Sequence, residues 1–189
     1  GYRIKLLGIA KKRDKGIELR VHPTLIPEKR LIANVNGAMN AVVVKGNMVG
    51  PTLYYGAGAG ALPTASAVVA DLIDISRSSQ VPPHGFVDNK IDSIPVYKIE
   101  DAISGYYLRI RVSDKPGVLA EITKIFGDKK ISIDAMLQKE PQEHESEADI
   151  VILSHLAVER DINTVIDSIE SLSATIGKVI KIRLEELSK

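Results

Sequence analysis

A run of alternating glycines within residues 50–77 comes nearest, in residue type and spacing, to a ligand-binding loop. Gly56, Gly58 and Gly60 follow an extended segment and precede a helical pattern with Pro63 in its first turn. Backbone amides at a helix start have no intrahelical partner and can face an anion. The glycine order matches neither the dinucleotide nor the phosphate-loop pattern, since no Lys or Arg follows. Spacing alone therefore leaves two interpretations, a ligand-facing loop and a tight strand-to-helix connection.

Other residue types that often carry chemistry show no productive spacing. There is no cysteine, which excludes disulfide frameworks, thiolate nucleophiles and zinc-cysteine sites. The histidines are scattered without an i, i+4 pair, so we assign no metal. Ser66 lacks the GxSxG context of a nucleophile elbow. Asp71 and Asp74 are interpreted as exposed helix acids opposite an apolar stripe.

The first part of the chain predicts antiparallel strands and one long helix. The expected strands are residues 2–10, 17–21, 41–47 and 51–55, with turns at 14–16 and 36–37 and a break at His22-Pro23. The helix after the glycines ends near Arg77, and its stripe is expected to cover one face of the sheet through Ala65, Val68, Val69 and Leu72.

Residues 105–189 show a regular alternation of strand and helix patterns. The expected order is strand 106–112, a helix that starts at 114–117 and stops at Gly127, strand 131–137, acidic loop 141–147, strand 149–156, helix 159–172 and strand 179–184. This βαββαβ order is ferredoxin-like, with two helices over one face of a four-stranded antiparallel sheet. Residues 78–104 contain Pro82-Pro83 and Pro95 without periodicity and are predicted to be a linker.

Length and composition bound the class of protein. A chain of 189 residues with 44% hydrophobic and 26% charged residues is globular and fits one large or two small domains. No apolar run approaches the ~20 residues of a membrane span, so we expect no membrane partner. The basic cluster at 11–15 has no interleaved aromatic residues, and we expect no nucleic-acid partner. The lack of cysteine agrees with a cytoplasmic location, and the start at Gly1 suggests a piece of a longer protein.

Two segments, Tyr107-Leu-Arg-Ile-Arg-Val-Ser-Asp-Lys-Pro-Gly-Val-Leu-Ala-Glu-Ile and Ile131-Ser-Ile-Asp-Ala-Met, carry a resemblance to ACT regulatory domains that covers residues 105–189. Such domains bind amino acids, so the resemblance implies an effector site made by Asp114, Gly117, Val118, Leu119 and Asp134. Amides at the helix start would meet the carboxylate, and Asp134 of a paired subunit would meet the ammonium. Two structural roles stay open, Asp114 as a helix cap worth about 1 kcal/mol and Gly117 as a turn former.

Residues 1–77 resemble the C-terminal part of the catalytic region of homoserine dehydrogenases. The residues that carry this resemblance are Gly1-Tyr-Arg-Ile-Lys-Leu-Leu-Gly, His22-Pro23, Asn36-Gly37, Asn40-Ala41-Val42, Tyr55-Gly-Ala-Gly-Ala-Gly and Pro63-Thr-Ala-Ser-Ala-Val-Val-Ala-Asp. Bacterial enzymes of this family carry an ACT domain after a linker, so the two resemblances agree in order and spacing.

The resemblance implies an oxidoreductase that interconverts L-aspartate 4-semialdehyde and L-homoserine with NAD or NADP, on the way to threonine, methionine and isoleucine. In the family, the Rossmann domain and the segment with the acid/base lysine precede the part seen here. We therefore assign no catalytic residue in this fragment and expect no stable cofactor binding to it. Contact with cofactor and substrate is implied for a closing loop made by Gly56, Gly58, Ala59, Gly60, Pro63 and Thr64.

The combined expectation is an α+β protein. Residues 1–77 form a mostly antiparallel sheet domain with a covering helix, 78–104 a linker, and 105–189 a ferredoxin-like ACT domain. Expected partners are the protein's own Rossmann domain, a second copy in a homodimer or higher oligomer, and threonine as effector. The alternative is a non-catalytic amino-acid sensor or assembly module.

Overall fold

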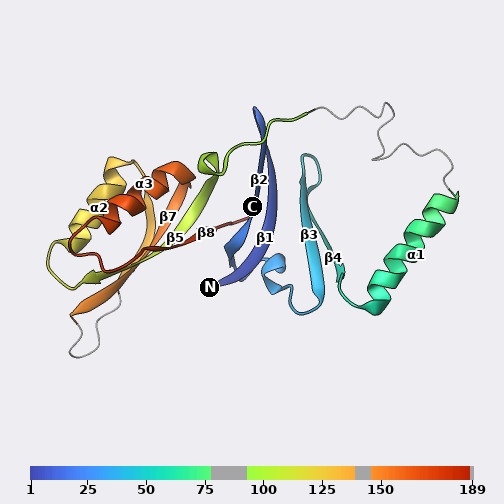
Figure 1. Ribbon diagram of the computed structural model, residues 1–189, viewed down its shortest axis with the longest axis horizontal. Coiled ribbons are helices and arrows are strands. Elements are labelled where there is room, and N and C mark those ends of the chain that lie inside the picture. The colour runs from blue at the N-terminus through green and yellow to red at the C-terminus, as the bar shows by residue number, and fades with distance from the viewer. Residues whose placement is uncertain (78–92, 139–145, 188–189) are drawn as a thin grey trace. The chain divides into compact units, whose positions relative to one another are not determined.

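The computed structural model describes residues 1–77, 93–138 and 146–187 (Figure 1). Packing divides the chain into two compact units, one made of Gly1–Pro27 with Ile94–Lys189 and the other of Glu28–Ser93. The first 27 residues therefore pack with the C-terminal part of the chain. The boundaries expected at residues 77 and 105 stay predictions, and most of the expected linker and of the acidic loop at 141–147 lies outside the described residues.

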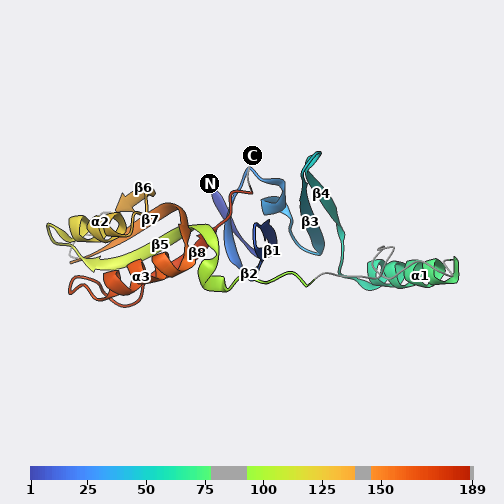
Figure 2. The ribbon, with the colours of Figure 1, turned by 90° about the horizontal axis from the view of Figure 1, so that it is seen from above.

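The larger unit is built on one six-stranded sheet in the order β1-β2-β8-β5-β7-β6, seen from two sides in Figures 1 and 2. Its elements are β1 (Tyr2–Arg13), β2 (Gly16–Pro27), η3 (Ile99–Asp101), β5 (Ile103–Ser113), α2 (Val118–Asp128), β6 (Ile133–Gln138), β7 (Glu147–Val158), α3 (Glu159–Glu170) and β8 (Ile180–Leu184). All pairings in this sheet are antiparallel except that of β2 with β8.

The four strands β8-β5-β7-β6 and the helices α2 and α3 form the predicted ferredoxin-like fold. Alternate residues of β5 point into one core with the apolar stripes of both helices. The fully buried members of that core include Leu108 and Ile110 of β5, Ile122 and Phe126 of α2, and Val165 of α3. An alternating strand against helical stripes is the pattern that a helix-covered sheet requires, and the expected βαββαβ order is confirmed.

The β1–β2 hairpin adds two strands to this sheet. Thr24 and Leu25 of β2 pair in parallel with Arg183 and Leu184 of β8. The predicted break at His22-Pro23 is wrong, because β2 continues to Pro27. Pro23 is tolerated since it pairs with β1 on one side only, before β8 begins to pair on the other.

The other end of β2 is held by the segment that leads into β5. The amide of Ile17 donates to the carbonyl of Pro95 at 2.8 Å, and the amide of Tyr97 donates to the carbonyl of Ile17 at 2.9 Å. Arg13 donates to the Asp101 carbonyl at 2.8 Å and lies over the Tyr97 ring. The hairpin is thus fixed to the ACT-like unit at both ends of β2.

The end of α2 differs from the expected stop at Gly127. The helix continues to Asp128, and Lys130 adopts the left-handed conformation with φ of 56°. The amide of Ile131 then closes the turn by donating to the Phe126 carbonyl at 3.0 Å. A C-terminal cap of this kind usually takes glycine, so a lysine there leaves no sequence signal.

The smaller unit contains η1 (Leu31–Asn34), the antiparallel hairpin β3 (Met39–Gly46) and β4 (Gly50–Ala57), and α1 (Ala61–Arg77). The strands, the Asn36-Gly37 turn and the end of α1 near Arg77 agree with the sequence. The expectation that α1 covers one face of the sheet is wrong, because every residue of this helix except Pro63 is exposed. The apolar residues Val68, Val69 and Leu72 of its stripe are exposed. No helix in the described ranges is long and apolar enough to cross a membrane.

Gly16 tests the attachment of the hairpin. A Cβ at Gly16 would lie 2.2 Å from the Pro95 carbonyl oxygen, whereas one at Gly8 in the same hairpin meets only Val21 Cγ2 at 3.9 Å. We expect Gly16→Ala to lower the free energy of unfolding by about 1–3 kcal/mol and Gly8→Ala to change it by less than about 0.5 kcal/mol. Urea denaturation measures both, and equal effects would contradict the close approach.

Candidate functional site

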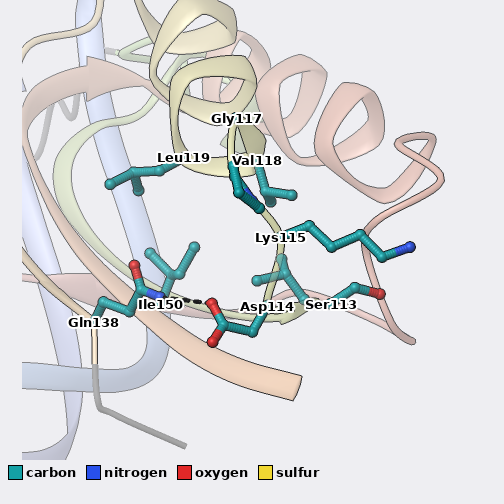
Figure 3. Close-up of a pocket in the computed structure, with 10 residues that line it drawn as sticks. Ser113, Asp114, Lys115, Gly117, Val118, Leu119, Gln138 and Ile150 are labelled. Atoms are coloured by element: carbon teal, nitrogen blue, oxygen red, sulfur yellow. Dashed lines mark hydrogen bonds between the residues drawn. The ribbon is translucent and has the colours of Figure 1, made fainter. Parts of the chain in front are cut away.

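A pocket of about 440 Å³ lies where β5 ends and α2 begins (Figure 3). Its lining comes from this junction, from the end of β6 and from β7 near its start: Val112, Ser113, Asp114, Lys115, Pro116, Gly117, Val118, Leu119, Gln138 and Ile150. The structure therefore brings together four of the five predicted effector residues, Asp114, Gly117, Val118 and Leu119.

The start of α2 presents backbone amides to this pocket. Gly117 is the N-cap residue with φ of 95°, and no side chain caps the helix. The Val118 amide makes a long 3.4 Å turn bond to the Lys115 carbonyl, while within the described residues no group accepts from the Gly117 or Leu119 amide. Free amides at a helix start favour a carboxylate.

Asp114 has a different role from the expected helix cap. Its side chain points toward Gln138, whose Nε2 donates to Asp114 Oδ1 at 3.4 Å, while Lys115 extends away from Gln138 (Figure 3). Asp114 supplies a negative charge near the free amides, and Gln138 supplies both a donor and an acceptor. The pocket thus offers separate partners for a carboxylate and an ammonium group.

Asp134 lies outside this pocket in the same chain. Its carboxylate is 3.7 Å from His155 Nε2, and both side chains are more than half exposed. An ammonium partner supplied by Asp134 therefore requires a second copy of the chain, as the resemblance implies. Its role in binding stays a prediction.

Gln138 and Ile150 are pocket residues that the sequence did not indicate. They reach the site through the antiparallel register of β6 and β7, which places Gln138 opposite Ile150. Strand register across a loop of unknown conformation cannot be derived from periodicity alone. The apolar run at residues 149–156 predicted the strand β7 but not its contribution to the pocket.

The glycine loop connects β4 to α1 in the smaller unit. The Gly58 amide donates to the Ala38 carbonyl at 3.4 Å, and a Cβ at Gly58 would lie 2.4 Å from Asn40 Nδ2. Gly60 has φ of 128° and accepts from the Thr64 amide at 3.1 Å at the start of α1. The six predicted contact residues, Gly56, Gly58, Ala59, Gly60, Pro63 and Thr64, are adjacent, and all except Pro63 are exposed.

The composition of this loop is better suited to contacting a flat ligand through its backbone than to binding a phosphate group. The loop contains no basic residue, and of the first three residues of α1 only Ala61 and Leu62 have N–H groups. Glycine and alanine let a nicotinamide ring or a small substrate approach the backbone closely. The loop's role at a cofactor stays a prediction. Among the described residues, no three His, Asp or Glu side chains gather as metal ligands.

The most perturbed titratable groups lie away from the pocket, between β2, β8 and α3. Burial opposes ionisation of Glu159, but hydrogen bonds from Arg183, Lys181 and Tyr106 outweigh it and lower the pKa of this carboxyl. Burial, helped by the Glu159 charge, raises the pKa of Tyr106. Because these groups pair with one another and do not line the pocket, we interpret them as structural rather than catalytic.

Comparison with protein families first defines the class of the unit that holds the pocket. Residues 106–174 match the ACT domain family. The larger unit is therefore an ACT domain to which the N-terminal hairpin adds two strands. Residues 1–73 match the family described as homoserine dehydrogenase.

Individual relatives agree over the whole chain. A homoserine dehydrogenase of Methylobacillus glycogenes is 52% identical over 188 residues, which are 99% of this chain and 45% of the relative. That of Pseudomonas aeruginosa is 48% identical over 194 residues, covering 100% and 45%. The crystal structure of a homoserine dehydrogenase from Thiobacillus denitrificans has a TM-score of 0.90 at 56% identity and covers 100% of this chain and 43% of that one.

The chain thus belongs to the homoserine dehydrogenase family, with a homoserine dehydrogenase segment at residues 1–73 and an ACT domain at 106–174. It spans slightly less than half the length of these relatives.

Gly117 offers a test of the pocket with a matched control in the same helix. A Cβ would have open space at both Gly117 and Gly127, but only Gly117 has a positive φ. We expect Gly117→Ala to destabilise the chain by about 1–2 kcal/mol and to displace the amides that face the pocket. Gly127→Ala is expected to stabilise α2 by about 0.5–1 kcal/mol. Thermal unfolding of the two variants measures the difference, and a neutral Gly117→Ala would contradict the geometry.

The lowered pKa of His22 leads us to expect that the folded chain loses stability at acidic pH. Burial, together with Arg183 and Arg20, lowers the pKa of His22 against the raising effect of its hydrogen bond to the Pro23 carbonyl. The unfolded chain therefore binds the proton more tightly, so stability is full above about pH 6.5 and falls as the pH drops below that value.

We expect His22→Asn to remove this loss between about pH 6.5 and pH 5. His155→Asn, at an exposed position, serves as the control and retains the loss. Denaturation midpoints measured across this range decide the matter. The same pH dependence in His22→Asn and the unmodified chain would assign the effect to another group.

Proposed function

We propose that this chain is the C-terminal part of a homoserine dehydrogenase that interconverts L-aspartate 4-semialdehyde and L-homoserine with NAD or NADP, in the pathway to threonine, methionine and isoleucine. The observation that carries this proposal is the order of two family segments in one chain, at 48–52% identity to homoserine dehydrogenases over essentially every residue. A module used only for amino-acid sensing would not need the first segment, and an assembly module that did use it would show no turnover in the full-length protein.

In this proposal, the acid/base and nucleotide-binding residues lie in the part of the enzyme that precedes this chain. The nicotinamide cofactor, when bound, exchanges a hydride with the substrate carbonyl carbon. The loop from Gly56 to Thr64 closes the reaction space from the other side and limits access of water. The exposed glycine and alanine backbone supports that role, since it allows contact without a side chain between.

The ACT pocket is proposed to bind L-threonine as a feedback inhibitor. Its supporting geometry is a helix start with free amides next to Asp114 and Gln138, in a space of about 440 Å³. A threonine carboxylate would accept from the Gly117 and Leu119 amides, and its ammonium would pair with an acidic side chain. Inhibition requires that threonine bind a less active state more tightly than the active one.

Exposed apolar surfaces support the expected partners. The outer face of the β1–β2 hairpin exposes Ile4, Leu6 and Val21, and the stripe of α1 exposes Val69 and Leu72. Apolar surface of this extent in a water-exposed protein is usually covered by another domain or subunit. We propose that the preceding half of the enzyme and a second copy cover it, in a cytoplasmic homo-oligomer.

The reaction is tested by comparing this chain with the full-length protein that contains it. Full-length protein with NAD or NADP and L-homoserine is expected to increase absorbance at the reduced-nicotinamide band, whereas the 189-residue chain gives no change. L-threonine is expected to inhibit the full-length protein, and Gly117→Ala to weaken this inhibition about tenfold. Sustained turnover by the chain alone would place acid/base residues within it, and an inactive full-length protein would support the sensor alternative.

A further inference from the structure

The β1–β2 hairpin attaches to the ACT domain through charged residues that are buried. Alternate residues of β2 point inward, and Glu18, Arg20, His22 and Thr24 are all less than 9% exposed. The opposite face of the same strand exposes apolar residues. Charged side chains are rarely buried unless they are paired. Glu18 is paired inside the hairpin, with Arg13 and Arg20, and Arg20 also reaches Glu185, which follows β8.

Arg20 finds its partners on both sides of the β2–β8 junction. Its side chain is 1% exposed, and it lies 2.8 Å from Glu185 and 3.2 Å from Glu18. Lys11 of β1 also donates to Glu185 at 2.7 Å. The Glu185 amide donates to the Leu25 carbonyl at 3.0 Å, so this residue is held to the hairpin by backbone and side chain together.

A second group of buried charges continues from this point into the ACT domain. Glu159, the first residue of α3, is 2% exposed and accepts from Tyr106 of β5 at 2.8 Å. Arg183 donates to both of its oxygens, at 2.8 and 2.6 Å, and Lys181 donates at 2.5 Å. The charge of Arg183 lowers the pKa of His22 in the hairpin, and the charge of Glu159 raises it. We call the whole set the hairpin–ACT cluster: Lys11, Glu18, Arg20, His22, Tyr106, Glu159, Lys181, Arg183 and Glu185.

Such a cluster contributes little to the free energy of folding, but it restricts the position of β2 relative to β8. Buried ion pairs gain little net free energy over an apolar contact, because desolvation offsets most of the attraction. Moving one partner away is costly, since it leaves a buried charge unpaired. A small slide of β8 against β2 would separate the buried Arg20 from Glu185 and so carry this cost.

The same strands lead to the effector pocket. β5 carries Tyr106 of the cluster near one end and Val112 and Ser113 of the pocket at the other. β8 pairs with β5 from Gly105 to Arg109 and with β2 at Thr24 and Leu25. A displacement of β5 at the pocket thus has a continuous, hydrogen-bonded route to the homoserine dehydrogenase segment.

We propose that the hairpin–ACT cluster couples the ACT domain mechanically to the homoserine dehydrogenase segment, so that the β1–β2 hairpin moves and opens only together with the ACT sheet. The regulatory part of this inference rests on the proposed amino-acid effector. The mechanical part does not, and it can be tested without ligand.

The mechanical test is hydrogen exchange in the full-length protein that contains this chain. In the unmodified protein, amides of β1 and β2 are expected to exchange at the same slow rate as those of β5 and β7. Glu185→Gln should speed exchange in the hairpin about tenfold or more and leave β5 and β7 unchanged. Lys11→Gln removes a half-exposed partner and should act in the same direction by a smaller factor, which keeps the test decisive if Glu185→Gln does not fold.

Lys178→Gln is the matched control, because it removes one partner of an exposed ion pair with Glu170 in the same unit. The mechanical inference is wrong if both cluster variants exchange like this control. It is also wrong if the hairpin already exchanges faster than β5 and β7 in the unmodified protein, or if Glu185→Gln speeds all four strands equally.

The regulatory test uses the same variants with L-threonine. Glu185→Gln should raise the threonine concentration for half-inhibition about fivefold, with kcat and KM for L-homoserine retained within about twofold in its absence. Unchanged inhibition in this variant would overturn the regulatory part. An unmodified enzyme that threonine does not inhibit would refute the effector assignment, and the exchange result alone would then decide the coupling.

Discussion

The architecture of the larger unit depends on the parallel pairing of β2 with β8. Two residue pairs, Thr24 with Arg183 and Leu25 with Leu184, turn a four-stranded ACT sheet into a six-stranded one. So short a ladder supplies few backbone hydrogen bonds, and the buried charges around Arg20 add to the attachment at this end of β2, while Ile17 pairs with Pro95 and Tyr97 at the other end. The hairpin of the homoserine dehydrogenase segment is in this way part of the same sheet as the ACT domain, which joins the two family segments in one compact unit.

The smaller unit shows the opposite situation, a set of elements that form without a core of their own. Hairpin β3–β4 and helix α1 satisfy their backbone hydrogen bonds locally, yet α1 buries none of its side chains. An amphipathic helix gains most of its stability from packing its apolar face, so the exposed face of α1 supports the proposed interface with another domain or subunit. The exposed glycine loop between them is consistent with half of a site that another domain completes.

The sequence predicts the ACT fold well because each of its elements has a strong period and ends at a turn signal. It also predicts the strand–loop–helix order around the glycines and a helix start within 114–117, where Gly117 has a positive φ. It does not predict the β2–β8 pairing, since strands so distant in sequence carry no mark of their register. The sequence did not predict Gln138 as a pocket residue for the same reason. The end of α2 was missed because Lys130, not a glycine, adopts the left-handed conformation there.

The most direct test of the central claim is an NMR titration of the amides at the β5–α2 junction with L-threonine. If this pocket is an amino-acid site, the Gly117 and Leu119 amide resonances shift saturably, and amides of the exposed α1 helix do not move. An absence of shifts at the junction up to millimolar threonine, or saturable shifts confined to other regions, would contradict the account.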